Sequence, residues 1–157
     1  MRLSAVITVV LPLLVGAASG PLAAQSGGPF TVAETGRSYA RLQDAVGAIG
    51  AGTGTIRIAP GTYRQCAVQE QGRIAYVAAE LGRSVFERVT CEDKAALVLR
   101  GAGARVDGLV FTHLQVADGN GAGIRIEKGD LAVATTRFID NQSGILSASD
   151  PTATITV

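Results

Sequence analysis

The sequence has no tryptophan, one histidine, two cysteines and a single methionine, which is the first residue. Aromatic residues make up only 4% of the chain, and the formal net charge is +1, from 14 basic and 13 acidic side chains. This balance excludes a nucleic-acid-binding domain held by a broad excess of basic residues. An apolar fraction of 47% excludes a disordered chain, and the lack of a Gly-X-Y period excludes collagen despite 20 glycines. The 157 residues allow one domain.

Residues 1–24 are predicted to be a cleaved secretory signal, which leaves residues 25–157 as the mature domain. Arg2 supplies a positive charge, the apolar run from Ala5 to Val15 follows, and small residues lead to a cleavage site after Ala24. Pro12 interrupts the run, which is shorter than the roughly 20 residues of a membrane span, so a retained anchor is the lesser alternative. No later segment is apolar enough to span a membrane, and a secreted or periplasmic location is expected.

Cys66 and Cys91 are expected to form a disulfide, because an even cysteine count in an exported chain favours pairing. The bridge would close a loop of 24 residues, which contributes about 3 kcal/mol in the chain-entropy model. Two free buried thiols or half of a metal site are the alternatives, and zinc would need ligands beyond His113, the only histidine. The segment between the cysteines departs from the repeat described below, so we interpret it as an elaboration beside the first coils.

One helix and many short strands are predicted in the mature chain. Apolar residues recur at spacings of three and four over 38–49, which predicts a helix that buries Tyr39, Leu42, Val46 and Ile49. Ser38 is the expected N-cap, and Gly50 follows the last periodic residue. Residues 25–37 should be an extended lead-in, and an alternating strand over 55–59 ends at Pro60-Gly61. Further strands are expected at 95–100, 105–116 (one or two strands), 123–127, 131–139, 144–147 and 153–157.

The strands beyond Cys91 repeat every 21–27 residues, which is typical of a β-solenoid. A shift of 27 residues superimposes Leu97 on Ile124, Leu99 on Ile126, Val106 on Val133, and Phe111 on Phe138. A shift of 21 superimposes Gly123-Ile124 on Gly144-Ile145, and a shift of 22 places Leu131 on Ala153 and Val133 on Ile155. Stacked coils are needed because one coil cannot bury its own inward face. A β-sandwich with chance spacing is the alternative, whereas the leucine and asparagine pattern of a leucine-rich repeat is absent.

Two parts of the mature chain match the pattern of a known family. The first combines Phe30-Thr31-Val32, the predicted helix, and the segment from Gly54 to Tyr63 with its Pro-Gly-Thr-Tyr turn; the second is Phe138-Ile139-Asp140-Asn141 followed by Gly144-Ile145. Both resemble right-handed parallel β-helix proteins of the pectate-lyase-like class. The resemblance implies an all-β, right-handed parallel β-helix with an N-terminal capping helix. It also implies a carbohydrate-active protein that binds an acidic polysaccharide or processes it by lyase, epimerase or glycoside hydrolase chemistry.

Catalysis is left open, because that class also contains non-catalytic surface proteins. The second hypothesis is a surface or periplasmic scaffold that binds a glycan or a protein along its flat face. The third is an inactive fragment of a longer protein: residues 153–157 form an alternating strand with no cap after it, so we expect the C-terminus to be truncated. No catalytic residue is assigned, and the oligomeric state stays open.

The candidate substrate-binding residues are few. The shift of 27 places Arg100 beside Glu127 and Val98 beside Arg125, so Arg100, Arg125 and Glu127 are expected on one outer face. Such a group suits a sugar acid, but a solvated strand face with a cross-strand ion pair is the favoured interpretation. Asp118 and Asn120 lie in a glycine-rich insertion and could offer oxygens to a substrate or to calcium, the only cofactor considered, or form an Asx turn.

Three further polar residues are interpreted structurally. Asp140 and Asn141 are expected to form a turn, since Asn tolerates the left-handed conformation. His113 follows a strand and has no evident serine or cysteine partner, so packing or surface exposure is expected. The segments Gly101-Ala102-Gly103 and Gly119-x-Gly121-x-Gly123 are not dinucleotide-binding loops, because no helix pattern follows either.

Overall fold

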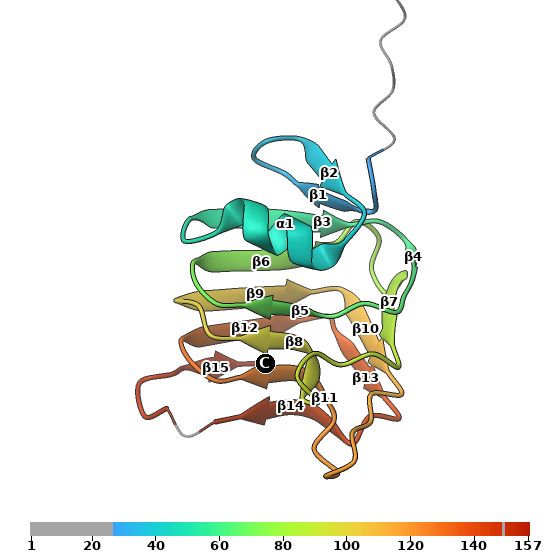
Figure 1. The fold of residues 1–157 in the computed structure, drawn as a ribbon, viewed down its shortest axis with the longest axis vertical. Helices are drawn as coiled ribbons and strands as arrows, with labels where there is room; N and C mark the ends of the chain where they lie inside the picture. Colours follow the sequence, from blue (N-terminus) through green and yellow to red (C-terminus); the bar gives the residue numbers. More distant parts are fainter. Residues whose placement is uncertain (1–26, 149) are drawn as a thin grey trace, which may run out of the picture.

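The chain winds into a β-solenoid of stacked coils whose N-terminal end is covered by a helix (Figure 1). The computed structural model describes residues 27–148 and 150–157, so the predicted signal over 1–24 lies outside the described residues. Within the described residues, no helix is long and apolar enough to cross a membrane. The all-β class and the N-terminal helix are as predicted.

Each coil contributes one strand to each of three sheets, here named A, B and C. Before the coils come β1 (Phe30–Val32), β2 (Arg37–Tyr39) and α1 (Leu42–Ile49). The first coil contains β3 (Thr53–Ile58), β4 (Gly61–Tyr63) and β5 (Ala67–Gln69), and the second contains β6 (Arg73–Ala78), β7 (Ser84–Glu87) and β8 (Ala95–Leu99). The third contains β9 (Gly103–Asp107), β10 (Leu109–Thr112) and β11 (Ala122–Ile126). The fourth contains β12 (Asp130–Ala134), β13 (Arg137–Ile139) and β14 (Ser143–Ser147), and β15 (Ile155–Thr156) returns to sheet A.

The strands of successive coils pair in parallel, which is the solenoid arrangement that the repeat predicted. Sheet A has the order β15-β12-β9-β6-β3-β1-β2, and only β1 runs antiparallel to its neighbours. Sheet B has the order β13-β10-β7-β4, and sheet C has the order β14-β11-β8-β5. Side chains on alternate positions therefore point into a common core or out to solvent.

The predicted registers are confirmed in the third and fourth coils, with one exception. Pairing at a shift of 27 joins Leu97 to Ile124 and Phe111 to Phe138, and pairing at a shift of 21 joins Ile124 to Ile145. The shift of 22 is wrong, because Leu131 pairs with Ile155 rather than with Ala153. The segment between β14 and β15 is two residues longer than the shift of 22 assumes. It therefore places an isoleucine, instead of an alanine, beside Leu131.

The interpretation of the segment between the cysteines is also wrong. It forms β6 and β7, which are regular strands of the second coil. The disulfide between Cys66 and Cys91 is confirmed, with a Cα–Cα distance of 5.5 Å, and it joins the first coil to the second. The turn from 88 to 94 lengthens the second coil, so that β6 pairs with β9 at a shift of 30. This longer shift hid the repeat in the sequence.

The capping helix begins later than predicted. Ser38 and Tyr39 belong to β2, which pairs with β1, and Arg41 is the N-cap residue without a side-chain cap. Instead, the Leu42 backbone N–H donates to the side-chain Oε1 of Gln65 at 2.9 Å. A residue of the first coil therefore satisfies a helix end that lacks its own cap. The predicted end at Gly50 is confirmed by its φ of 57°.

The core contains a column of aromatic rings that runs through the coils. The ring centroids are separated by 5.0 Å (Phe30–Tyr63), 5.4 Å (Tyr63–Phe86), 5.7 Å (Phe86–Phe111) and 5.5 Å (Phe111–Phe138). Five of the seven aromatic residues thus occupy one column, which explains how a chain with few aromatics fills its core.

One corner of the fourth coil was not predicted from the sequence, and the next one was. The strand expected over 131–139 is two strands, because the backbone turns at Thr135, whose φ is +45°. The turn at Asp140 and Asn141 is confirmed: Asp140 takes the left-handed conformation with a φ of +52°. The Asn141 side chain accepts from the Leu114 N–H at 3.0 Å and donates to the Phe111 carbonyl at 3.0 Å. It therefore ties the fourth coil to the third.

Candidate functional site

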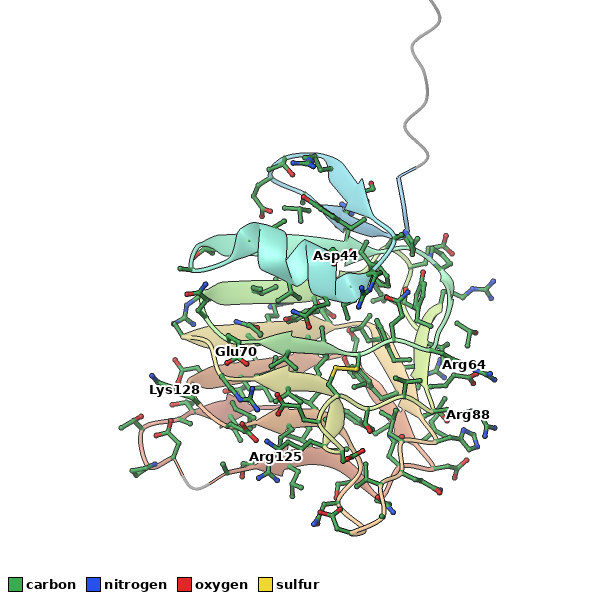
Figure 2. All side chains as sticks on the ribbon, viewed as in Figure 1. Asp44, Arg64, Glu70, Arg88, Arg125 and Lys128 are labelled. Carbon is green, nitrogen blue, oxygen red and sulfur yellow. A yellow bond between two sulfur atoms is a disulfide. The ribbon has the colours of Figure 1, made fainter. Side chains whose placement is uncertain are left out.

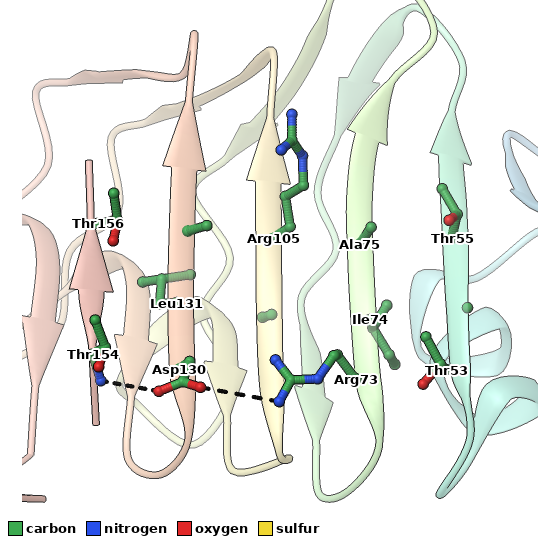
Figure 3. A pocket seen from close by; sticks show the side chains of 13 residues that line it. Thr53, Thr55, Arg73, Ile74, Ala75, Arg105, Asp130, Leu131, Thr154 and Thr156 are labelled. Atoms are coloured by element: carbon green, nitrogen blue, oxygen red, sulfur yellow. Dashed lines mark hydrogen bonds and ion pairs between the residues drawn. The ribbon is translucent and has the colours of Figure 1, made fainter. Parts of the chain in front are cut away.

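The outer face of sheet A carries a groove of about 530 Å³ (Figure 3). It crosses β3, β6, β9, β12 and β15, a distance of about 19 Å at the usual strand spacing of about 4.8 Å. Two outward columns of side chains form it, and each is fixed by the register. One column contains Thr53, Arg73, Gly103 and Asp130, and the other contains Thr55, Ala75, Arg105, Ala132 and Thr156.

Small side chains at the centre of these columns leave the groove open. Ala75 and Ala132 lie on either side of Arg105 in one column, and Gly103 separates Arg73 from Asp130 in the other. A Cβ at Gly103 would lie 2.3 Å from a terminal nitrogen of Arg73, so only glycine lets that guanidinium lie across the third coil. There the Arg73 Nη2 donates to the Ala102 carbonyl at 3.2 Å.

The charged groups of the groove form two pairs. Arg73 and Asp130 are 4.0 Å apart, and their side chains are 55% and 51% exposed. Asp130 also accepts the Thr154 backbone N–H at 3.1 Å, which holds the carboxylate at the groove wall (Figure 3). Such an exposed and long pair contributes little to stability and leaves both groups accessible to a ligand.

The second pair lies beside the groove. Arg105 Nη2 donates to the Asp107 Oδ2 at 2.6 Å, and the Thr135 hydroxyl donates to the other carboxylate oxygen. The Thr135 hydrogen bond, and then that of Arg105, hold the pKa of Asp107 below its ordinary value. A carboxylate kept ionised in this way is a poor general acid. Arg105 remains 56% exposed and keeps donors that face solvent.

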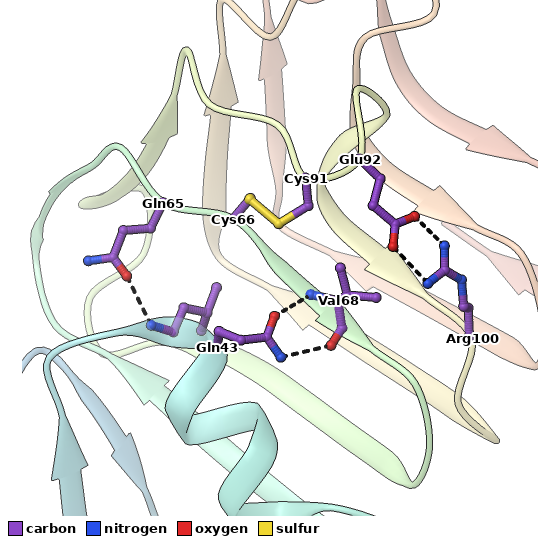
Figure 4. Close-up of a disulfide and its surroundings, with 8 residues drawn as sticks. Gln43, Gln65, Cys66, Val68, Cys91, Glu92 and Arg100 are labelled. Carbon is purple, nitrogen blue, oxygen red and sulfur yellow. Dashed lines mark hydrogen bonds and ion pairs between the residues drawn. A yellow bond between two sulfur atoms is a disulfide. The ribbon is translucent and has the colours of Figure 1, made fainter.

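The predicted residues Arg100, Arg125 and Glu127 are brought together, but at the end of sheet C rather than in this groove. Figure 2 labels Arg125 on this face. Arg100 Nε donates to Glu127 at 2.7 Å. Its Nη1 donates to Glu70 at 2.7 Å and to Glu92 at 3.0 Å, and its Nη2 bonds the same Glu92 carboxylate (Figure 4). Every nitrogen of this guanidinium is therefore engaged within the protein.

This ion-pair cluster spans the first three coils and the turn that follows Cys91. Lys94 completes it with contacts to Glu92 at 3.2 Å and to Glu127 at 2.8 Å. Hydrogen bonds from Arg100, and then from Lys94, lower the pKa of Glu92 to about 2. The pKa of Glu127 is lowered first by Lys94. Mutual compensation of these charges fits the structural alternative stated for the pair, while substrate binding by these residues stays a prediction.

Arg125 has a different environment on the same face. It lies between Val98 and Leu146 on the outer side of sheet C, and its Nε is 3.7 Å from the Glu127 carboxylate. That Nε is buried and has no hydrogen-bond partner among the described residues. Its attraction to Glu127 partly offsets the cost of leaving this donor unsatisfied.

Asp118 and Asn120 lie in the loop between β10 and β11, outside the ion-pair cluster. The Asp118 Oδ1 accepts the Asn120 backbone N–H at 3.0 Å, which is the Asx turn given as the alternative. This bond is the main reason that the pKa of Asp118 is lowered, and Arg125 makes a smaller contribution. Within the described part of the chain, no group of three or more acidic, histidine or cysteine side chains could hold a metal ion. Calcium binding stays a prediction.

His113 lies at the corner that follows β10, with a φ of +54°. Its Nδ1 is 2.7 Å from the Thr112 hydroxyl, and its Nε2 is 3.8 Å from the Asp140 carboxylate. The side chain is 42% exposed, which agrees with the expected surface position.

The arginines of the groove were missed by the sequence analysis. Arg73 precedes the visible repeat, and its partners follow it at shifts of 30 and then 27 residues. The sequence signal that could have found them is the alternation of apolar and polar residues in β6 and β9, which places Arg73 and Arg105 on the outward side.

In comparisons with known proteins, no family model, no curated protein and no solved structure matches this chain. The strand pairing therefore establishes the β-solenoid by itself. Function has to be argued from the chemistry of the exposed faces.

Proposed function

We propose that this protein is an exported parallel β-helix, similar to the pectate-lyase-like class, that binds an acidic polysaccharide in the groove of sheet A. The observation that carries the proposal is the groove itself, about 530 Å³ in volume, with Arg73 and Arg105 exposed beside small side chains. An extended chain could lie across several strands there. The disulfide agrees with an oxidising compartment.

The polar groups of the groove suit a sugar acid. A planar guanidinium can bind a carboxylate through two parallel hydrogen bonds, and Arg73 and Arg105 come from adjacent strands. Threonine hydroxyls at both ends of the groove can donate to and accept from sugar hydroxyls; they belong to Thr53, Thr55, Thr154 and Thr156. Alanine at the centre of the groove leaves room for a flat ring to approach the sheet.

Binding is favoured over glycoside hydrolysis. A glycosidase needs a carboxylic acid that can donate a proton. Asp107 is held ionised by Thr135 and Arg105, and Asp130 is occupied by Arg73 and by a backbone N–H. Neither carboxylate is arranged as a proton donor.

The test is a titration of the mature protein with polygalacturonate and alginate, with neutral dextran as the comparison polymer, followed by calorimetry. Replacing both groove arginines (Arg73→Gln and Arg105→Gln) should weaken binding to the acidic polymers by about tenfold or more, because charge-assisted hydrogen bonds contribute about 1.5–3 kcal/mol each. Arg88→Gln removes one positive charge from an exposed corner of sheet B, by the same substitution, and should leave binding unchanged.

Equal binding of dextran and the uronates, or an unchanged affinity in the double variant, would refute the proposal. Formation of unsaturated uronate, followed by its ultraviolet absorbance, would show that the groove has lyase activity in addition to binding.

A further inference from the structure

The corner between sheets A and B presents two arginines without acidic partners. Arg83 precedes β7 directly, and Arg137 begins β13. Neither side chain takes part in an ion pair or a side-chain hydrogen bond within the described residues. Arg64, Arg100 and Arg105, in contrast, each contact a carboxylate. We propose that Arg83 and Arg137 form a binding site for a compact oxyanion, a phosphate or sulfate group, on the outer face of sheet B.

The register brings both side chains to the same outer face. Val110 is the register partner of Arg137 on one side and of Val85 on the other, so these three side chains form one outward column. Ser84 is fully buried, and alternation therefore turns its neighbour Arg83 outward together with Val85. Val110 is only 4% exposed although it lies on the outer face, which fits cover by the stem of Arg137.

Gly82 brings the Arg137 guanidinium close to the backbone of Arg83. It is the chain neighbour of Arg83, and a Cβ built on it would lie 2.6 Å from the Nη2 of Arg137. The Arg137 guanidinium therefore reaches from the fourth coil, past the third, to the backbone of the second. Gly82 takes a φ of +70° and donates its N–H to the Gly108 carbonyl at 2.7 Å, so this backbone is held in place.

A shallow hollow of about 420 Å³ adjoins this point. It is lined by Pro60, Gly61, Thr62, Gly82, Arg83 and Val85. The Thr62 hydroxyl adds a donor in the hollow that Arg83 lines, whereas the backbone N–H groups of Gly61 and Gly82 are already bonded to carbonyls. An oxyanion, which only accepts hydrogen bonds, would therefore be bound here by side-chain donors and not by backbone N–H groups.

Charge favours an anion at this corner. The Arg137 guanidinium lies against the residue that precedes Arg83, so two unpaired positive side chains belong to one corner, and a bound oxyanion would offset their mutual repulsion. Glu80, in the same turn, forms no ion pair with either arginine. The hollow lies on sheet B and shares no residue with the groove on sheet A, so this site does not depend on the proposed polysaccharide binding.

The oxyanion could be free or part of a lipid headgroup. Leu81 is 68% exposed at the same corner, and its Cδ2 lies 2.6 Å from the position of a Cβ on Gly108. An exposed leucine beside two arginines would suit the surface of an anionic membrane as well as a soluble ester.

The experiment titrates the mature protein with inorganic phosphate and with sodium sulfate, followed by side-chain Nε resonances of the arginines and by calorimetry. Binding should be saturable, should weaken with added sodium chloride, and should fall by about tenfold or more in the variant with Arg83→Gln and Arg137→Gln. Arg88→Gln is the matched control, because it removes one exposed and unpaired arginine from another corner.

A second arm uses vesicles of phosphatidylglycerol, with phosphatidylcholine vesicles for comparison. Vesicle binding that requires Arg83, Arg137 and Leu81 identifies the lipid headgroup as the source, and phosphate binding without vesicle binding identifies a free oxyanion. Both outcomes support the site. Phosphate affinity that is unchanged in the double variant, or that falls equally in Arg88→Gln, overturns it.

Discussion

Phe111 is the fourth of the five rings in the aromatic column, and its truncation tests whether that column holds the coils together. The side chain is fully buried, and its ring lies 5.7 Å from Phe86 and 5.5 Å from Phe138. Phe→Ala substitutions in cores cost about 3–5 kcal/mol. Two lost aromatic contacts, at about 0.5–1.5 kcal/mol each, place Phe111→Ala toward the upper end of that range. A domain of this size has a total stability of about 5–15 kcal/mol, so a loss of about 5 kcal/mol would remove a third or more of it.

The measurement is urea denaturation of the mature protein, followed by circular dichroism, with the slope checked for two-state behaviour. Ile139→Ala is the control, because Ile139 follows Phe138 in β13 but is 42% exposed and should cost about 0.5 kcal/mol or less. A loss below about 1.5 kcal/mol for Phe111→Ala, or a loss equal to that of the control, would refute the role of the column.

Two further predictions concern buried and charged polar groups. Tyr76→Phe should destabilise the protein by about 1–3 kcal/mol in the same assay, because the buried Tyr76 hydroxyl donates to the Gln69 side chain at 3.1 Å and no other side-chain donor would replace it. The folded-state pKa of Glu92, about 2, lies below its ordinary value of 4.5, so its contribution to stability is present above pH 4.5 and is lost as the pH falls toward 2. Arg100→Met should therefore flatten the decline in stability over that interval.

Each of these predictions can fail in a defined way. An unchanged urea midpoint in Tyr76→Phe would mean that the side-chain oxygen of Gln69 accepts a hydrogen bond from another donor. Parallel stability curves for Arg100→Met and the parent between pH 4.5 and 2 would show that solvent screens the exposed Glu92 pair completely.

The repeat was visible in the sequence only where successive coils have equal lengths. Strands β8, β9 and β10 pair with their successors at one common shift of 27, so Leu97, Val106 and Phe111 all found their partners. The second coil is lengthened by the turn from 88 to 94, and its strands pair with those of the third coil at a shift of 30 in sheet A, 25 in sheet B and 27 in sheet C. A search with one fixed period therefore could not reveal the second coil as part of the repeat.

The helix start and the groove needed contacts between distant residues. Ser38 has the character of an N-cap, but pairing of β2 with β1 takes it into a strand, and Gln65 provides the cap from the first coil. The contact of Arg100 with Glu127 followed from the visible shift. Its other partners, Glu70 and Glu92, come from a coil and a turn that the repeat did not place.

The disulfide has a mechanical consequence. It joins residues 25 positions apart in the first and second coils, so that part of the chain cannot lengthen when the two ends are pulled. At about 3.4 Å per residue, roughly 85 Å of contour is withheld from extension. The third and fourth coils, together with β15, lie outside this covalent loop and can peel away one after another under load. A protein anchored at its N-terminal end would therefore yield from the other end first, while its first coils resist.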